Sequence, residues 1–490
     1  MSAPSVFGRA VLALSLMIGF YLLAIVVAVL LFAVPYFTVA YMNFVSLKLT
    51  LGCVLGGLAI LVSLVPRPHR FHPPGPELAR EDHPRLFEQI EEVAAATGQS
   101  MPREVYLDTE VNAWVAERGG FLGIGSRRVM GLGLPLMQVI TVPQLRAVLA
   151  HEFGHYHGGD TRLGVFVYQI RAAIGRTIEN TGGSAVNGLF VWYGNWFLRV
   201  THAVSRAQER TADALAARVA GARELAGGLL AVRRAGLSFR AFWNTEVVDV
   251  LEARRRVPVL SGFAQFLAAP RIHGELDELL AQPEEADPYD THPPLDERLE
   301  ALGGAPDAAE GPLAITLFGD PGAAEQQYLD MTAGPQTQSF AEIEWEDVGQ
   351  AVALPGMRRF VDSQRAALAG VTAGDLPRIA AAPQDLAQRL AIPAQLGSLE
   401  NRVRLAANVV GAGLAIVLAE RGFKVLSLPG CPIELVGPDG SDDRLLPFDV
   451  FGELASGTVP AEAWTARCRA WGIADVEFAA VAAAGAGAAA

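Results

Sequence analysis

The sequence contains very little cysteine and almost no lysine. Three of its 490 residues are cysteine, and Lys48 and Lys424 are its only lysines. Cys53 lies within an apolar run, while Cys431 and Cys468 are far apart and match no metal-ligand or redox spacing. No disulfide framework is therefore predicted.

Positive charge is scarce in the chain as a whole. The sequence has 39 Lys and Arg residues against 52 Asp and Glu residues, which gives a formal net charge of −13. This balance argues against a nucleic-acid-binding groove, and a short basic cluster such as residues 254–256 is typical of a solvated helix surface. We expect no nucleic-acid partner, and the sequence predicts no oligomeric state.

Charge is absent altogether from residues 10–34, a run of 25 positions that is long enough to span a lipid bilayer. A second apolar run at 49–65 extends back to residue 44, with Lys48 able to reach the interface. The first run is longer than the apolar core of a signal peptide, and the second follows closely. We therefore predict a retained transmembrane hairpin, which with a Pro-rich connector occupies residues 1–75.

The few flanking charges predict the orientation of this hairpin. The turn at residues 35–43 has no Lys or Arg, whereas Arg9 precedes the first run and Arg67 and Arg70 follow the second. Positive residues remain on the cytoplasmic side of a membrane. We expect a multi-pass protein of the cell (inner) membrane with both ends of the hairpin in the cytoplasm.

A His-Glu-x-x-His motif ends an apolar segment that is predicted to be helical. Thr141 and Gln144 have the spacing of a capping box, which specifies the start of that helix. Residues four apart share one face of a helix, so His151 and His155 can offer two imidazoles to one metal ion. Glu152 lies beside them, where it can take a proton from a water molecule that the metal activates.

A catalytic zinc site needs a third protein ligand. A metzincin would carry a histidine at position 161, where this chain has Thr161. A gluzincin takes a glutamate from a later helix, and Glu209 offers one. Asp213 follows one turn later, where it can accept a hydrogen bond from the far nitrogen of a ligand histidine. The spacing favours a gluzincin site with one Zn²⁺ per chain.

Four separated motifs carry a family resemblance over roughly residues 10–305. They are Asn112-Ala113-Trp114, His151 to His155, Ser205-Arg206-x-x-Glu209-x-x-x-Asp213, and Thr291-His292-Pro293-Pro294 followed by Glu297-Arg298. In these motifs and their order the chain resembles the membrane-bound gluzincin family of the HtpX and CAAX prenyl proteases. Members often have two further spans between the second and third motifs; here that stretch holds only short apolar runs interrupted by arginine, so fewer spans are expected.

The resemblance implies roles for individual residues. Glu209 would complete the zinc ligands and Asp213 would order the site. Residues 112–114 would lie on the strand that pairs with substrate. His292 would lie near the metal and could stabilise the oxyanion, although by itself a histidine before a helix is more typical of a cap. Independently of the resemblance, Arg298 is expected to pair with an acidic residue near the site, and Arg206 to pair with Asp160.

The predicted fold class is α+β. Residues 76–310 are expected to form a mainly helical zincin domain, with a helix at 77–98 and a small antiparallel sheet from strands at 104–107, 113–116 and 128–132. The aromatic stretch at 186–200 is too short to span, and it fits either a membrane-interface or cleft-covering segment or core packing.

Residues 311–480 are predicted to form a C-terminal α+β domain without a catalytic constellation. Its expected strands are at 313–318, 423–428 and 433–436, and its expected helices at 358–368 and 401–421. The apolar part of the last helix, 405–419, is too short to span a membrane. An Ala/Gly tail at 481–490 is predicted to be disordered.

Together these features predict a membrane-anchored zinc endopeptidase that acts on unfolded or membrane-associated proteins. CAAX processing is disfavoured because two spans cannot build a large membrane chamber. Two alternatives remain open at this point. One is a non-catalytic membrane adaptor that binds peptides, and the other is a zinc hydrolase of a non-peptide substrate.

Overall fold

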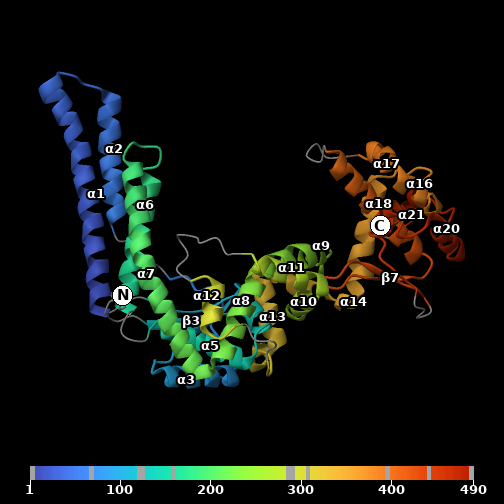
Figure 1. Ribbon diagram of the computed structural model, residues 1–490, viewed down its shortest axis with the longest axis horizontal. Coiled ribbons are helices and arrows are strands. Elements are labelled where there is room, and N and C mark those ends of the chain that lie inside the picture. Colours follow the sequence, from blue (N-terminus) through green and yellow to red (C-terminus); the bar gives the residue numbers. More distant parts are fainter. Residues whose placement is uncertain are drawn as a thin grey trace. The chain divides into compact units, whose positions relative to one another are not determined.

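The computed structural model describes residues 6–65, 71–118, 127–156, 161–282, 293–304, 310–391, 398–438 and 443–484. The chain folds into two compact units (Figure 1). The first unit consists of Met1–Gly236 and Leu280–Thr332, and the second of Leu237–Leu279 and Ala333–Ala490. Each unit is therefore built from two separate stretches of sequence.

Two long apolar helices open the first unit. Helix α1 (Val6–Met42) and helix α2 (Leu47–Leu64) pack side by side (Figure 1). Leu14–Met42 and Leu47–Leu64 are each long and apolar enough to cross a membrane. Outward side chains such as Leu22 and Leu55 are more than half exposed, as expected for a surface that faces lipid. The N-terminal hairpin is thus confirmed as a pair of apolar helices.

Helix α6 (Thr161–Asn180) and the start of helix α7 (Asn187–Ala220) lie beside this hairpin (Figure 1). The guanidinium of Arg176 donates to the backbone oxygen of Ser63 at 3.1 Å, and Asn180 donates to the Ser63 hydroxyl at 2.8 Å. These bonds satisfy polar groups at the end of α2, where the helix leaves its carbonyls without partners. In the described part of the chain, neither α6 nor α7 meets the length and apolarity of a membrane span.

The aromatic stretch at 186–200 presents two different faces on α7. Phe190 and Tyr193 are buried against α1, and the Tyr193 hydroxyl donates to the backbone oxygen of Leu16 at 2.7 Å. On the other side, Trp192 and Trp196 stack with ring centroids 6.5 Å apart and are 61% and 43% exposed. Core packing therefore accounts for one face of the stretch and leaves an exposed pair of tryptophans on the other.

The sheet of the first unit has the order β1-β3-β2, from strands β1 (Glu104–Asp108), β2 (Ala113–Arg118) and β3 (Arg127–Gly133). β2 and β3 pair antiparallel, but β1 and β3 run parallel, so the expectation of an antiparallel sheet is wrong in this detail. The reason is that β3 inserts between β1 and β2. Residues 76–78 cover the outer edge of β1 through two backbone hydrogen bonds of 2.7 and 3.0 Å.

Helix α5 (Val142–Gly154) carries the His-Glu-x-x-His motif. Both bonds of the capping box between Thr141 and Gln144 are present. The α5 start is also held from outside, because Val142 donates its backbone N–H to the Pro312 oxygen at 2.8 Å. The helix packs against α3 (Pro84–Thr97), α7 and β2 with its apolar face fully buried. The motif therefore lies on a well-specified, buried helix.

The other helices of the first unit are short, apart from α8, which continues into the second unit. They are α4 (Leu134–Met137), α8 (Ala222–Phe242), α12 (Leu295–Ala301), the 3₁₀ helix η3 (Ala314–Leu317) and α13 (Pro321–Thr332). The strand expected at 313–318 is wrong, since only Leu313 forms a β-bridge, with Thr141. The helix expected at 77–98 begins at Pro84, because residues 76–78 are used at the sheet edge.

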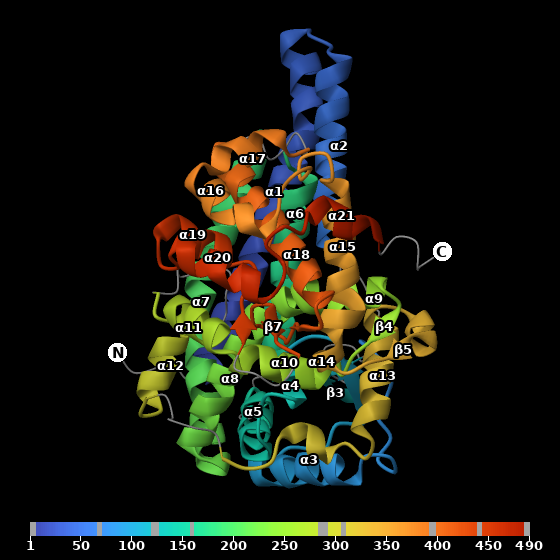
Figure 2. The same ribbon diagram turned by 90° about the vertical axis from the view of Figure 1, so that its right-hand side faces the viewer.

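The second unit has helix α18 (Leu399–Ala419) at its centre. Helices α15 (Leu354–Ser363), α17 (Pro383–Arg389), α19 (Val450–Ser456) and α21 (Phe478–Ala484) pack around it (Figure 2). By length and composition this 21-residue helix could cross a membrane, but 61% of its apolar window is buried inside the unit. Its burial, and not a short length, accounts for its apolar sequence.

The rest of the second unit consists of short elements. They are η2 (Trp243–Val247), α9 (Val248–Glu252), β4 (Arg255–Arg256), α10 (Val259–Ala268), α11 (Pro270–Leu280), η4 (Pro335–Ser339), β5 (Ala341–Glu342), α14 (Trp345–Val348), η5 (Gly349–Ala353), η6 (Ala373–Asp375), α16 (Leu376–Ala381), β6 (Lys424–Leu426), β7 (Glu434–Val436), β8 (Arg444–Leu445) and α20 (Ala461–Ala470). Residues 481–484, expected to be disordered, belong to α21, and 485–490 lie outside the described residues.

The compact units cross the boundary that the sequence predicts at residue 310. Residues 237–279 join the second unit because Trp345 is buried among them. Its indole donates to the Pro258 oxygen at 2.9 Å and lies so close to Gly262 that an added Cβ would be 2.4 Å from the ring. Conversely, residues 311–332 belong to the first unit, where they meet the start of α5. The assignment of 76–310 and 311–480 as independent domains stays a prediction.

Candidate metal centre

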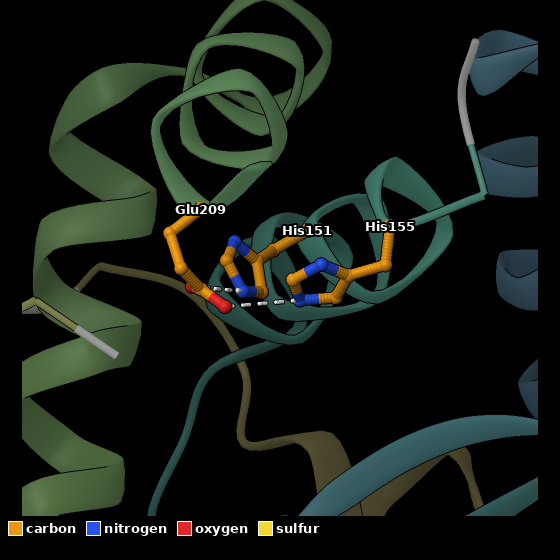
Figure 3. Close-up of side chains that lie close together, drawn as sticks. All are labelled: His151, His155 and Glu209. Carbon is orange, nitrogen blue, oxygen red and sulfur yellow. Dashed lines mark ion pairs between the residues drawn. The ribbon is translucent and has the colours of Figure 1, made fainter. Parts of the chain in front are cut away.

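Helices α5 and α7 bring three potential ligands to one point (Figure 3). His151 and His155 project from α5 and Glu209 from α7, and one donor atom of each lies within 4.8 Å of the others. Nε2 of His151 is 3.4 Å from one Glu209 oxygen, and Nε2 of His155 is 3.6 Å from the other. Two imidazoles and one carboxylate are a donor set that suits zinc.

A glycine allows the two helices to approach closely at this point. Gly154 of α5 faces Ala212 of α7, and a Cβ added at Gly154 would lie 2.8 Å from the Ala212 Cα. Any larger residue would push the helices apart. The close approach lets Glu209, three residues before Ala212, reach both histidines.

Two further side chains, those of Asp213 and Arg298, lie beside Nδ1 of His151. Oδ1 of Asp213 is 2.9 Å from Nδ1 of His151. Arg298, on α12, donates to both oxygens of Asp213, at 2.9 and 2.7 Å. All three side chains are buried. Asp213 therefore fixes the His151 ring with Nδ1 protonated, which turns Nε2 toward the ligand cluster.

These contacts shift two pKa values in opposite directions. Burial opposes protonation of His151, but its hydrogen bonds to Asp213 and Glu209 outweigh burial and raise the pKa of His151 to about 9. Burial likewise disfavours the Asp213 carboxylate, but hydrogen bonds from His151 and Arg298 lower the pKa of Asp213 to about 2. In the metal-free protein a positive imidazole thus sits among carboxylates, where a metal cation would otherwise supply the positive charge.

Glu152 is half-buried next to the cluster, and its negative charge contributes to the raised pKa of His151. The sequence predicts no role for Tyr156, which follows His155, because no motif or periodicity marks it. Its hydroxyl donates to the Val115 oxygen on β2 at 2.8 Å, and its ring lies 4.4 Å below the Arg128 guanidinium. Burial raises the pKa of Tyr156, so the hydroxyl stays protonated. Tyr156 ties the end of α5 to the sheet.

The residues expected on the substrate-pairing strand have different surroundings. Trp114 lies across Gly131 of β3, and its indole donates to the Asp108 carboxylate at 2.7 Å. The Asn112 side chain accepts a hydrogen bond from the backbone N–H of Ala113 at 2.9 Å. The Trp114 side chain therefore stabilises the sheet, and substrate contacts from this segment would come from its backbone.

His292 and Asp160 were also expected near the site, but both lie outside the described residues, as does His157. Arg206 is exposed and makes no hydrogen bond or ion pair within the part of the chain that the structure describes. His273 is half exposed and pairs with Asp277 one turn along α11.

Comparisons with known proteins agree with this geometry. Residues 80–305 match peptidase family M48. A protease HtpX homologue of Tropheryma whipplei (strain Twist) is 25% identical over 253 residues, which cover 46% of this chain and 74% of the relative. Protease HtpX homologue 1 of Sulfurisphaera tokodaii is 31% identical over 101 residues, or 20% of this chain and 31% of the relative. No solved structure gives a significant match. Residues 80–305 therefore form a peptidase family M48 domain, and the comparisons support an HtpX-like metalloprotease.

Proposed function

We propose that the protein is a zinc-dependent endopeptidase. The proposed ligands of its metal ion are His151, His155 and Glu209. The observation that carries this proposal is the convergence of three donor atoms within 4.8 Å from helices α5 and α7. A bound zinc ion would supply a Lewis acid that polarises the scissile carbonyl and activates water. Asp213 and Arg298 support the set, because they hold the His151 ring in the tautomer that leaves Nε2 available.

Glu152 is the proposed general base. It is adjacent to His151 on α5 and is half-buried. There its carboxylate takes the proton of the attacking water and later delivers it to the leaving amine. His292 is proposed to donate a hydrogen bond to the oxyanion, by resemblance to the family motif alone.

The edge strand β2 is the proposed binding site for the substrate backbone. It pairs with β3 on one side and contacts α5 through Tyr156 on the other. An extended peptide can add to such an edge through main-chain hydrogen bonds. These bonds require an extended backbone but no particular sequence. We therefore propose unfolded or membrane-associated proteins as substrates. The charge flanking the apolar hairpin favours an inner-membrane protein whose catalytic domain lies in the cytoplasm.

Purified protein in detergent tests the proposal directly. It should cleave an unfolded protein such as casein, lose this activity on chelation, and regain it with zinc in preference to magnesium or calcium. Casein binding without cleavage would instead identify a non-catalytic adaptor. Hydrolysis confined to small non-peptide esters would identify a different zinc hydrolase.

A trapping experiment identifies the natural substrates. The variant Glu152→Gln keeps all three metal ligands but lacks the base, so bound proteins should remain uncut. Proteins that co-purify with Glu152→Gln, but not with the metal-site variant Glu209→Ala, are candidate clients. A broad set of unfolded proteins would support quality control, whereas a single client would indicate dedicated processing.

A further inference from the structure

The sheet leaves one edge for an added strand, and its geometry specifies which backbone groups face outward. Among the described residues β2 pairs only with β3. Asn112 lies opposite Gly133 and accepts its backbone N–H at 2.8 Å. Along an antiparallel ladder, residue pairs that exchange backbone hydrogen bonds alternate with opposite pairs that do not. The backbone groups of Ala113 and Val115 therefore point away from β3, toward the open edge.

Side chains already engage two of these outward groups. The N–H of Ala113 donates to the Asn112 side chain at 2.9 Å. The C=O of Val115 accepts the Tyr156 hydroxyl at 2.8 Å. The Tyr156 ring is held in place by Arg128, which in turn donates to the Ser100 oxygen at 3.1 Å. The open edge is thus partly filled from the His155 end of α5.

A substrate strand would compete with Tyr156 for the Val115 oxygen. In an antiparallel ladder, each outward residue exchanges two bonds with one residue of the added strand, and its C=O accepts one of them. At Val115 the oxygen already accepts the tyrosine hydroxyl, so the substrate N–H meets a competing donor there. Where one hydrogen bond replaces another, pairing at this residue adds little net affinity.

We propose that Tyr156 is a specificity-determining residue that limits how far a substrate can pair with β2. Its hydroxyl ends productive backbone pairing at Val115, so affinity comes from the substrate residues that pair nearer to Ala113. A substrate therefore needs only a short extended segment to bind. Lengthening that segment past the residue opposite Val115 does not raise its affinity. This inference rests on the proposed peptidase function.

Peptide binding to the zinc-loaded Glu152→Gln protein tests the inference without turnover. The probes are fluorescent peptides lengthened one residue at a time at either end, measured by anisotropy. With Tyr156 present, affinity should stop rising at the residue opposite Val115. With Tyr156→Phe added, the same residue should increase affinity about fivefold, the size expected for one hydrogen bond.

Ester substitution identifies the bond responsible and needs no second protein variant. Replacing one peptide amide by an ester removes a single N–H donor. In protein that retains Tyr156, an ester opposite Val115 should leave affinity unchanged, whereas an ester opposite Ala113 should lower it about fivefold. In the Tyr156→Phe protein the ester opposite Val115 should cancel the gain.

Tyr106→Phe provides a matched control on the same sheet. It removes a hydroxyl that donates to Glu104 at 2.7 Å on β1, away from the open edge, and should leave the length dependence unchanged. Identical length dependence with and without Tyr156→Phe, or a gain that the ester does not cancel, would overturn the inference and leave the peptidase proposal standing. Failure of every peptide to bind would reject both.

Discussion

Arg298 and Asp213 are 85 residues apart in the sequence and form a two-pronged hydrogen-bonded pair, with Nε to Oδ2 at 2.9 Å and Nη2 to Oδ1 at 2.7 Å. The pair is buried directly behind His151, whose Nδ1 lies 2.9 Å from the same Oδ1. The orientation of a proposed metal ligand thus depends on a residue from α12, far along the chain.

Removing this arginine should weaken both metal binding and folding. Arg298→Met leaves the Asp213 carboxylate buried without its main partner, which costs about 3–5 kcal/mol of stability. Loss of such support for a ligand typically lowers metal affinity about 10–100-fold. Zinc competition titration and urea unfolding measure the two effects. Arg210→Met is the control, because Arg210 is 72% exposed and 4.0 Å from Glu297. Equal effects of both substitutions would contradict the supporting role.

Substitutions at Glu152 and Glu209 should have different effects on zinc binding and on cleavage. Glu152→Gln should keep zinc but lose at least about a hundredfold in casein cleavage, because it removes only the base. Glu209→Ala should lower zinc occupancy itself, since two histidines remain from a three-ligand set. Metal analysis beside the cleavage assay separates the two. Full activity in Glu152→Gln would rule out the mechanism.

The raised pKa of His151 predicts a pH dependence in the metal-free protein. Its folded pKa of about 9 lies above the ordinary value of 6.5. The folded state therefore holds this proton more tightly, and the resulting stability is fully present below pH 6.5 and lost as pH rises through about 9. Urea unfolding of chelator-treated protein at pH 6 and pH 9.5 measures the loss. His151→Gln should remove most of this difference, and an unchanged difference would assign it to other groups.

Two truncations test whether residues 311–332 belong with the metal site. Chains ending at Glu310 and at Thr332 both lack residues 333–490, so their difference isolates the segment that bonds to the start of α5. We expect the longer chain to bind zinc more tightly. Equal zinc binding would restore a boundary at 310.

The topology prediction depends on few charges and is easily tested. A reporter fused after Gly75 should behave as cytoplasmic, and one inserted near Met42, between α1 and α2, as external. The reverse pattern would overturn the proposed localisation. As a control, moving Arg9 and the arginines at 67 and 70 into the turn should invert both signals.

Local signals predict the elements that carry the site, because their causes lie within a few residues. The capping box at Thr141 specifies the start of α5, and helical spacing alone places His151 and His155 on one face. The same is true of the three strands, which are found within a few residues of their predicted positions.

Features that depend on tertiary contacts could not be predicted in this way. Residues 313–318 have the composition of a strand, but they meet a helix cap rather than a second strand, so a 3₁₀ helix forms. The parallel pairing of β1 and β3 depends on which strand is inserted between the others, which local pattern does not encode. The contact between Tyr156 and Val115 likewise arises from folding α5 against the sheet.

The interleaving of the two units has a consequence for the order of synthesis. During translation α5 and α7 emerge first, then residues 237–279, and only afterwards Arg298 and residues 311–332. The first unit can therefore close around its metal ligands when Thr332 has been made. At that moment Phe242, which packs on Phe263, still lacks its contact with Trp345. We therefore expect a nascent chain to pass through a stage in which the first unit has all its residues while this aromatic cluster, between the third and fourth motifs, is still without Trp345.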